Sequence, residues 1–113
     1  MIKLMLVDDE PQITTMLEKW FTKTKEFSVS VYNNPEVALS SFSSSKPDVV
    51  LLDIMMPQMD GIAVLEKIKS IDQFAVVIMM TAYSTLDRVL SSHRQGADRE
   101  MLLRAVKKRL KRK

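Results

Sequence analysis

The sequence lacks the features that mark secreted, disulfide-bonded or membrane-spanning proteins. Its 113 residues include no cysteine, and no apolar stretch reaches the roughly 20 residues that a membrane-spanning helix needs. The first residues enter an apolar run directly, without the basic and apolar parts of a secretory signal. We therefore expect a cytoplasmic protein. A chain of this length has room for one core, so residues 1–113 are predicted to form a single domain.

Positive charge is distributed unevenly along the chain. The formal net charge is +3, yet residues 104–113 carry seven Lys or Arg side chains and no acid. Such a tail is typical of an exposed helix end, where cations are stabilised by the helix dipole. No aromatic residue interleaves the tail and no recognition motif accompanies it, so we favour this interpretation over nucleic-acid binding.

Short apolar runs indicate four strands. Residues 2–7, 49–52 and 76–80 have the length and near-continuous hydrophobicity of strands that are covered on both faces. Residues 27–31 alternate apolar side chains with serine, which is typical of a strand nearer the edge of a sheet.

Segments with helical periodicity separate these runs. A helix over residues 35–42 is predicted, with Asn34 as its N-cap and Pro35 at its first position. Apolar stripes with a spacing of three and four residues indicate further helices: Ile13, Met16, Leu17 and Trp20; Val64, Leu65, Ile68 and Ile71; Leu86, Val89, Leu90 and His93; Leu102, Ala105, Val106 and Leu110. Strands that alternate with helices predict an α/β fold, a doubly wound parallel sheet with helices on both faces.

Polar side chains follow three of the predicted strands. Asp8, Asp9 and Glu10 come after the first strand, Asp53 after the third and Thr81 after the fourth. Ligands of doubly wound folds bind at the carboxyl ends of the strands, so we expect these side chains to converge there. Clustered carboxylates repel one another unless a pKa rises or a hard cation such as Mg²⁺ or Mn²⁺ binds.

Each of these residues also has a purely structural interpretation. Asp9 and Glu10 suit the N-cap of a helix entered through Pro11, Asp53 suits a turn, and Thr81 suits another cap. Caps alone give no reason for polar residues at three successive strand ends, so we favour a cation site. An aspartate at such a site can also act as a nucleophile toward phosphorus.

Four stretches of the sequence resemble the response-regulator receiver family of two-component signalling. They are LVDDEP at 6–11, PDVVLLDIMMP at 47–57, MDG at 59–61 and MMTA at 79–82, and the match holds in order and spacing over residues 1–98. The resemblance implies a flavodoxin-like receiver fold with strand order 2-1-3-4-5. It also implies a signalling module rather than an enzyme.

By this resemblance, Asp53 is the phospho-acceptor. It would receive the phosphoryl group from a phosphohistidine of a sensor histidine kinase or a phosphotransfer protein. Asp9, Asp53 and the backbone carbonyl of Met55 are expected to bind Mg²⁺ or Mn²⁺, and Asp8 is expected to act through a metal-bound water. Phosphoryl transfer depends on positioning and charge neutralisation, which such a site supplies.

The resemblance also implies a switch that a downstream effector protein reads. Thr81 is expected to bring its hydroxyl to a phosphoryl oxygen, and the small side chain of Ala82 is expected to leave the approach to Asp53 open. Gly61, after Asp60, is expected to give the turn before the next helix its backbone freedom.

The resemblance breaks after Asp98. Receivers continue there with a fifth strand that ends in a lysine, whereas this sequence continues at once with Arg99 and a helix-like segment. About five to six residues are missing, the length of one strand. Three explanations account for the missing residues. The sequence omits residues that the molecule has, the gene encodes a shortened receiver, or the deletion is deliberate. We favour the first. If the strand is absent, residues 76–80 form an open sheet edge, and dimerisation or domain swapping is expected.

Three alternative functions follow from the same residues. A pseudo-receiver would bind partners without being phosphorylated, because the lysine is missing. A phosphohydrolase also places an aspartate after a strand, but it typically has a second acid two residues later, where this chain has Met55. A flavin site would need a phosphate-binding loop after the first strand, and this chain has acids there. Apolar Met55 also predicts slow self-dephosphorylation, because no polar group at that position orients water.

Overall fold

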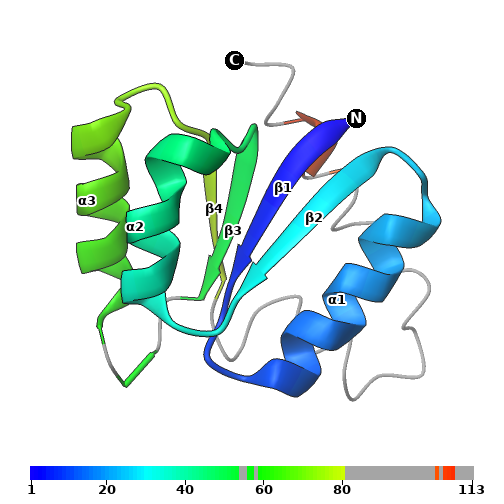
Figure 1. Ribbon diagram of the computed structural model, residues 1–113, viewed down its shortest axis with the longest axis horizontal. Coiled ribbons are helices and arrows are strands. Elements are labelled where there is room, and N and C mark those ends of the chain that lie inside the picture. Colours follow the sequence, from blue (N-terminus) through cyan, green and yellow to red (C-terminus); the bar gives the residue numbers. More distant parts are fainter. Residues whose placement is uncertain (54–55, 58, 81–103, 105, 109–113) are drawn as a thin grey trace.

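The computed structural model describes residues 1–53, 56–57, 59–80, 104 and 106–108 (Figure 1). Strands and helices alternate along the chain as the periodicity predicts. Along the described part of the chain the elements are β1 (Ile2–Val7), α1 (Pro11–Lys23), β2 (Phe27–Tyr32), α2 (Pro35–Ser45), β3 (Val49–Asp53), α3 (Gly61–Ile71) and β4 (Val77–Met80). Arg104 and residues 106–108 are also helical. The predicted helical stripe at residues 86–93 lies outside the described residues.

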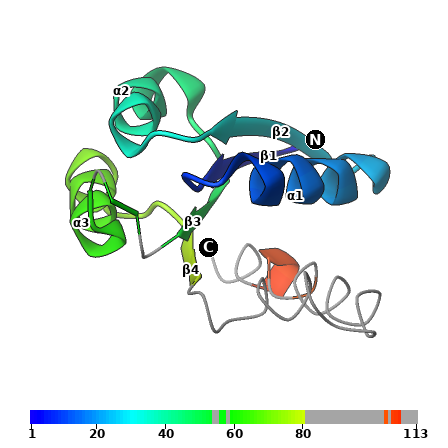
Figure 2. The same cartoon turned by 90° about the horizontal axis from the view of Figure 1, so that it is seen from below.

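The strands form a parallel sheet in the order β2-β1-β3-β4, visible from below in Figure 2. This confirms the predicted fold and the predicted place of β2 at the edge. The runs predicted at 2–7 and 49–52 coincide with β1 and β3 except that β3 includes Asp53, and β4 begins one residue later than predicted. The segment after Asp98, where a receiver has its fifth strand, lies outside the described residues.

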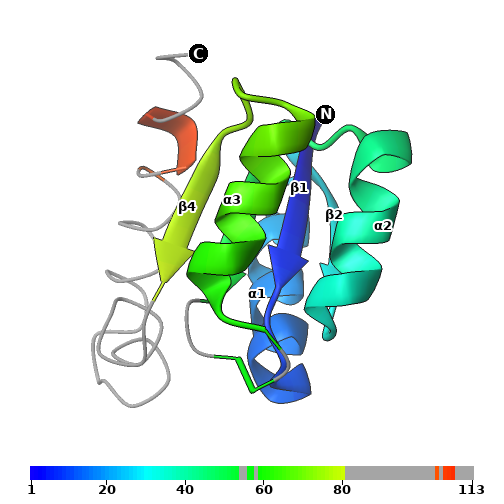
Figure 3. The same cartoon turned by 90° about the vertical axis from the view of Figure 1, so that its left-hand side faces the viewer.

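Successive strand residues point to opposite faces of the sheet, and each face has its own core. Leu4 and Leu51 belong to the core beneath α1, whereas Met5 and Val50 belong to the core beneath α2 and α3. All four side chains are at most 1% exposed. Figure 3 shows α2 and α3 in front of the strands and α1 behind them. Burial on both faces explains why these strands are continuously apolar.

The core beneath α1 also contains residues near the carboxyl end of the chain. Val106 is fully buried in this core, where Phe21 and Phe27 pack edge to face with ring centres 5.0 Å apart. Lys107 forms a 2.7 Å ion pair with Glu26, which precedes β2. The described part of the basic tail is therefore helical, with Val106 of the predicted apolar stripe packed into the core.

The helix ends show which local signals were sufficient. Asn34 caps α2 as predicted, accepting hydrogen bonds from the backbone N–H groups of Glu36 and Val37. The helix continues to Ser45, three residues beyond the predicted end. The prediction stopped early because serines 43–45 add no apolar periodicity. Lys46 then ends it in the left-handed conformation, with φ at 47°. Within the described residues, no helix is both long and apolar enough to cross a bilayer.

The prediction for Gly61 was wrong. This glycine is the buried first residue of α3 and has no positive φ. The helix start is stabilised instead by Asp60, whose side chain accepts a 2.8 Å hydrogen bond from the N–H of Ile62. The described residues with a left-handed backbone are two lysines, Lys25 and Lys46.

Candidate functional site

Three aspartates meet at the carboxyl edge of the sheet. Asp53 is the last residue of β3, and Asp8 and Asp9 directly follow β1. Because β1 and β3 are neighbouring parallel strands with Val7 opposite Leu52, their carboxyl ends lie side by side. One carboxylate oxygen from each aspartate lies within 4.8 Å of the other two. Asp8 is buried, whereas Asp9 and Asp53 are partly exposed.

The Asp8 carboxyl has an unusual protonation equilibrium. Burial raises its pKa from 3.8 to about 7, although a hydrogen bond from the backbone N–H of Glu10 opposes the shift. The negative charges of Asp53 and Asp9 raise the pKa further. Ionisation of Asp8 above about pH 7 therefore places a further negative charge beside Asp53 and Asp9, and a bound cation would relieve the resulting repulsion.

The ligand atoms of this cluster suit a hard divalent cation. Every candidate donor is a carboxylate oxygen, which Mg²⁺ and Ca²⁺ prefer over nitrogen or sulfur ligands. Mg²⁺ commonly binds one or two carboxylates and completes its shell with water and phosphate oxygens. A partly exposed cluster of three carboxylates leaves room for such ligands. The residues present thus fit Mg²⁺.

The purely structural interpretations of Glu10 and Asp53 are not supported. Glu10 occupies the N-cap position of α1, but its side chain makes no capping hydrogen bond. Asp53 is not a turn residue, because it is the last residue of β3 and lies opposite Met80 in β4. The Asp8 carboxylate does accept a turn-type hydrogen bond from the Glu10 N–H, but that bond does not account for the approach of Asp53 from a neighbouring strand.

The remaining predicted site residues fall where the structure is not described. Met55, Thr81 and Ala82 all lie outside the described residues. Their predicted roles therefore remain predictions. In the sequence, Thr81 follows Met80, the residue opposite Asp53.

Sequence reasoning missed one residue that contacts the site. The side-chain amide of Asn33 donates a 2.8 Å hydrogen bond to the backbone carbonyl of Asp8 and a 3.0 Å bond to the hydroxyl of Thr14. The backbone N–H of Asp8 donates to the carbonyl of Tyr32 at 3.1 Å. The only sequence signal was an asparagine directly after the edge strand, which is equally typical of any turn.

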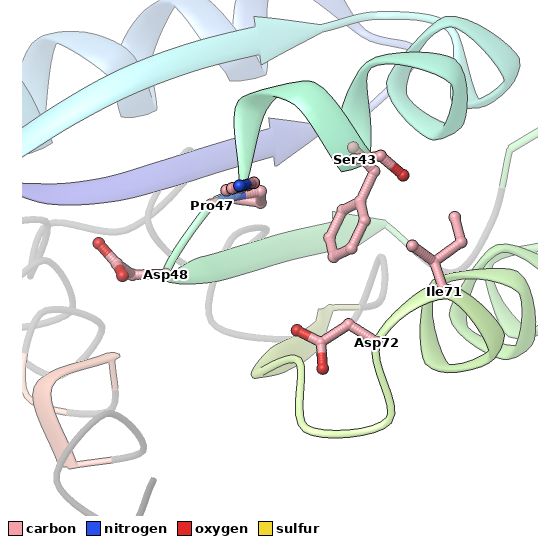
Figure 4. Close-up of a pocket in the computed structure, with 7 residues that line it drawn as sticks. Ser43, Pro47, Asp48, Ile71 and Asp72 are labelled. Atoms are coloured by element: carbon pink, nitrogen blue, oxygen red, sulfur yellow. The ribbon is translucent and has the colours of Figure 1, made fainter.

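One described cavity is remote from the aspartates. It has a volume of about 370 Å³ and is lined by Phe42, Ser43, Lys46, Pro47, Asp48, Ile71 and Asp72. Figure 4 shows Pro47 and Asp48 from the segment before β3, and Ile71 and Asp72 from the end of α3. Asp48 and Asp53 stand at opposite ends of β3, roughly 16 Å apart at about 3.3 Å per residue. The aspartate cluster is therefore separate from this cavity.

No described residue of the basic tail is placed at the aspartates as a replacement for the lysine that receivers carry after their fifth strand. Lys107 pairs with Glu26, whose carbonyl accepts a hydrogen bond from Ile2 where β1 begins. That ion pair is at the amino ends of the strands, opposite the aspartates. Arg104 is exposed, and Arg99 lies outside the described residues.

A family model described as "Response regulator receiver domain" matches residues 4–111. The chain belongs to the response regulator receiver family. It is therefore a receiver domain of two-component signalling, a signalling module rather than a classical enzyme. The phosphohydrolase and flavin alternatives are set aside on the same finding.

Two curated proteins illustrate the range of similar chains. The regulatory protein AtoC of Escherichia coli is 39% identical over 95 residues, which are 84% of this chain and 20% of AtoC. This chain thus spans about a fifth of that relative's length. Sporulation initiation phosphotransferase F of Bacillus subtilis is also 39% identical over 95 residues, covering 84% of this chain and 76% of that protein.

Solved structures agree with the family. The response regulator TrrA of Thermotoga maritima, in complex with Mg²⁺ and BeF, has 30% identity and a TM-score of 0.78, covering 96% of this chain and 99% of that one. A complex of the histidine kinase ThkA with TrrA matches with 36% identity and a TM-score of 0.68, covering 74% of this chain and 72% of that one. Clustered aspartates of this kind are typical of Mg²⁺-binding receivers.

Proposed function

We propose that this chain is a phosphorylatable switch of the cytoplasm, with residues 1–113 acting as one receiver domain. Asp53 accepts a phosphoryl group from a phosphohistidine of a sensor histidine kinase or a phosphotransfer protein. The added charge then changes the contacts of the chain with a downstream effector protein. The observation that carries the proposal is the convergence of the carboxylates of Asp8, Asp9 and Asp53 within 4.8 Å.

The transfer step uses the exposed side of the cluster. An oxygen of the Asp53 carboxylate forms a bond to phosphorus as the bond between phosphorus and the histidine nitrogen breaks, and the electron pair stays on the imidazole. Asp53 is partly exposed, so an incoming phosphohistidine has access to it. Such a step requires in-line positioning more than elaborate covalent chemistry.

With Mg²⁺ bound, the groups around Asp53 would neutralise the charge of the incoming phosphoryl group. Asp9, Asp53 and the backbone carbonyl of Met55 would hold Mg²⁺, and Asp8 would act through a water. When bound, Mg²⁺ supplies the positive charge that lets a negative phosphoryl group approach three carboxylates. Thr81 would donate its hydroxyl to a phosphoryl oxygen, and Ala82 would leave the approach unobstructed.

Solved relatives support the choice of partner and cation. TrrA has been solved with the histidine kinase ThkA, and separately with Mg²⁺ and BeF. Both structures align with most of this chain. By analogy, a histidine kinase and Mg²⁺ are the first partner and the first cation to test.

Intact-mass spectrometry tests the proposal directly. The purified chain is incubated with Mg²⁺ and a small phosphodonor such as acetyl phosphate, and we expect the mass to rise by one phosphoryl group. Asp53→Asn should abolish the gain, as should removal of Mg²⁺ with a chelator. Asp48→Asn is the matched control, because Asp48 stands at the other end of β3, where it accepts a hydrogen bond from the Lys3 backbone.

One alternative has an observation in its favour. A pseudo-receiver would bind partners without phosphorylation, because the sequence continues after Asp98 with Arg99 and Glu100 and carries no strand-like run that ends in a lysine. Absence of phosphoryl uptake by the wild-type chain, under conditions that modify a known receiver, would favour it. A mass above that of the 113-residue sequence would instead show that further residues exist.

The same missing strand bears on the oligomeric state. If the chain ends its sheet at β4, the open edge of that strand favours pairing with a second copy. Light scattering coupled to size-exclusion chromatography distinguishes a dimer or a domain-swapped pair from a monomer.

A further inference from the structure

The Asn33 side chain lies outside the aspartate cluster and connects three segments of the chain near Asp8. Asn33 directly follows β2, and its amide nitrogen donates to the Asp8 carbonyl at 2.8 Å and to the Thr14 hydroxyl at 3.0 Å. These acceptors are 25 and 19 residues away in the sequence. Asn33 thereby links the loop after β2, the loop after β1 and the first turns of α1.

Thr14 makes this link rigid. It is only 1% exposed, and its hydroxyl donates a 3.1 Å hydrogen bond to the carbonyl of Pro11 while accepting from Asn33. A buried hydroxyl with both functions in use is held in one orientation. The two amide hydrogens of Asn33 are likewise both used, one for each acceptor.

The Asp8 carbonyl, which accepts the first of these hydrogen bonds, lies next to a proposed cation ligand. The carbonyl of Asp8 belongs to the peptide group that joins Asp8 to Asp9, and a peptide group is planar. Fixing that carbonyl therefore fixes the direction in which the chain enters Asp9. The backbone N–H of Asp8 is held separately by the carbonyl of Tyr32, at 3.1 Å.

Repulsion between the carboxylates favours movement of the loop after β1 when the Asn33 hydrogen bonds are removed. The carboxylates of Asp8, Asp9 and Asp53 approach within 4.8 Å, and like charges at that distance favour separation. Without a fixed Asp8 carbonyl, rotation of the peptide group lets the Asp9 carboxylate swing away. A cation would then have to draw the ligands back together, at a cost in affinity.

We propose that Asn33 is a positioning residue for the divalent-cation site: its amide holds the peptide group between Asp8 and Asp9 so that the Asp9 carboxylate stays beside Asp53. This inference rests on the proposed Mg²⁺ site and adds a residue that determines its affinity. Hydrogen bonds outside the direct ligands commonly set metal affinity in this manner.

The chain offers a matched control at the next position. Asn34 is also an asparagine, but its side chain caps α2 through the N–H groups of Glu36 and Val37. Asn34→Ala therefore costs helix stability without touching the aspartate loop. Asn33 is exposed, so Asn33→Ala removes the two hydrogen bonds without opening a cavity in the core.

The experiment is a Mg²⁺ titration of the metal-free protein with no phosphodonor, followed by the amide NMR shifts of Asp9 and Glu10. We expect Asn33→Ala to weaken Mg²⁺ binding by about 3- to 10-fold, the loss that corresponds to the net free energy of one hydrogen bond. Asn34→Ala should leave the affinity unchanged within about 2-fold. Thr14→Val should weaken binding, and Thr14→Ser, which keeps the hydroxyl, should restore it.

Three outcomes would overturn the inference. Wild-type affinity in Asn33→Ala would show that the link does not position the ligands. Equal losses in Asn33→Ala and Asn34→Ala would show a general effect of destabilisation. Absence of Mg²⁺ binding by the wild-type chain would overturn the proposed cation site and, with it, the role of Asn33. This outcome differs from the other two, because both of those require a wild-type chain that binds Mg²⁺.

Discussion

The carboxylate of Asp8 accepts a 2.9 Å hydrogen bond from the backbone N–H of Glu10. Such a bond favours the ionised carboxylate, yet burial and the neighbouring acids outweigh it and raise the pKa of Asp8 to about 7. The folded protein therefore holds a proton on Asp8 that the unfolded chain releases near pH 4. The metal-free site is destabilised by its own charge at neutral pH.

Asp8→Asn is predicted to stabilise the metal-free protein at about pH 8. Because the folded pKa lies above the ordinary value of 3.8, wild-type stability falls as the pH rises from about 4 to about 7. Asparagine carries no charge and keeps an oxygen for the Glu10 N–H. We expect a gain of about 1 to 3 kcal/mol near pH 8 and little gain near pH 4, measured by urea denaturation with a chelator present. An equal gain at both pH values would contradict this account.

Mg²⁺ is predicted to stabilise the wild-type fold. A ligand that binds only the folded state adds about 1.4 kcal/mol to the free energy of unfolding when its concentration is ten times the dissociation constant. Removing Mg²⁺ should reverse the gain. Asp9→Asn deletes one carboxylate of the cluster and should show a smaller response in the same thermal or urea melts. A response identical to that of the wild type would place the cation elsewhere.

Lys46→Gly is predicted to raise stability by about 0.5 to 1 kcal/mol. Lys46 ends α2 with φ at 47°, a left-handed conformation that costs a residue with a Cβ about 1 to 2 kcal/mol. Glycine removes this cost, but it also raises the conformational entropy of the unfolded chain, which offsets part of the gain. The backbone hydrogen bond from its N–H to the Phe42 carbonyl remains in the variant. Lys46→Ala keeps a Cβ, so the same increase in that variant would rule out backbone strain as the cause.

Self-dephosphorylation of the phosphorylated chain is predicted to be slow. Met55 places an apolar residue two positions after Asp53, so no polar group at that position orients an attacking water. The decay of the phosphorylated mass over time measures the rate at neutral pH. Met55→Asn should accelerate it several-fold, and a wild-type half-life of seconds would refute the prediction.

Local patterns located most of the fold. Continuous apolar runs predicted β1 and β3 almost to the residue, because strands buried on both faces cannot alternate with polar side chains. Asn34 followed by Pro35 marked the start of α2 for a local reason, the capping of free N–H groups. The end of α2 was less predictable, because the helix continues through serines and stops at a lysine that carries no usual termination signal.

The composition of the candidate site was also readable from the sequence. Once the strands are known to be parallel, their carboxyl ends must lie along one edge, so Asp8, Asp9 and Asp53 converge by topology alone. The receiver motifs carried the family assignment that the comparisons bear out. Gly61 was misjudged because a glycine after Asp60 is equally typical of a turn and of a first helical residue, and its burial at the start of α3 depends on the tertiary structure.

The sequence by itself therefore determined the parallel sheet, the family and the three aspartates of the site. Only the tertiary structure decided how deeply Asp8 is buried, that Asn33 reaches its carbonyl, and that Lys107 pairs with Glu26 at the far end of the strands. The physical reason is the sequence separation over which the interactions act. Periodicity and capping arise from interactions within a few residues, whereas burial, a shifted pKa and contacts between distant segments depend on how the finished layers pack.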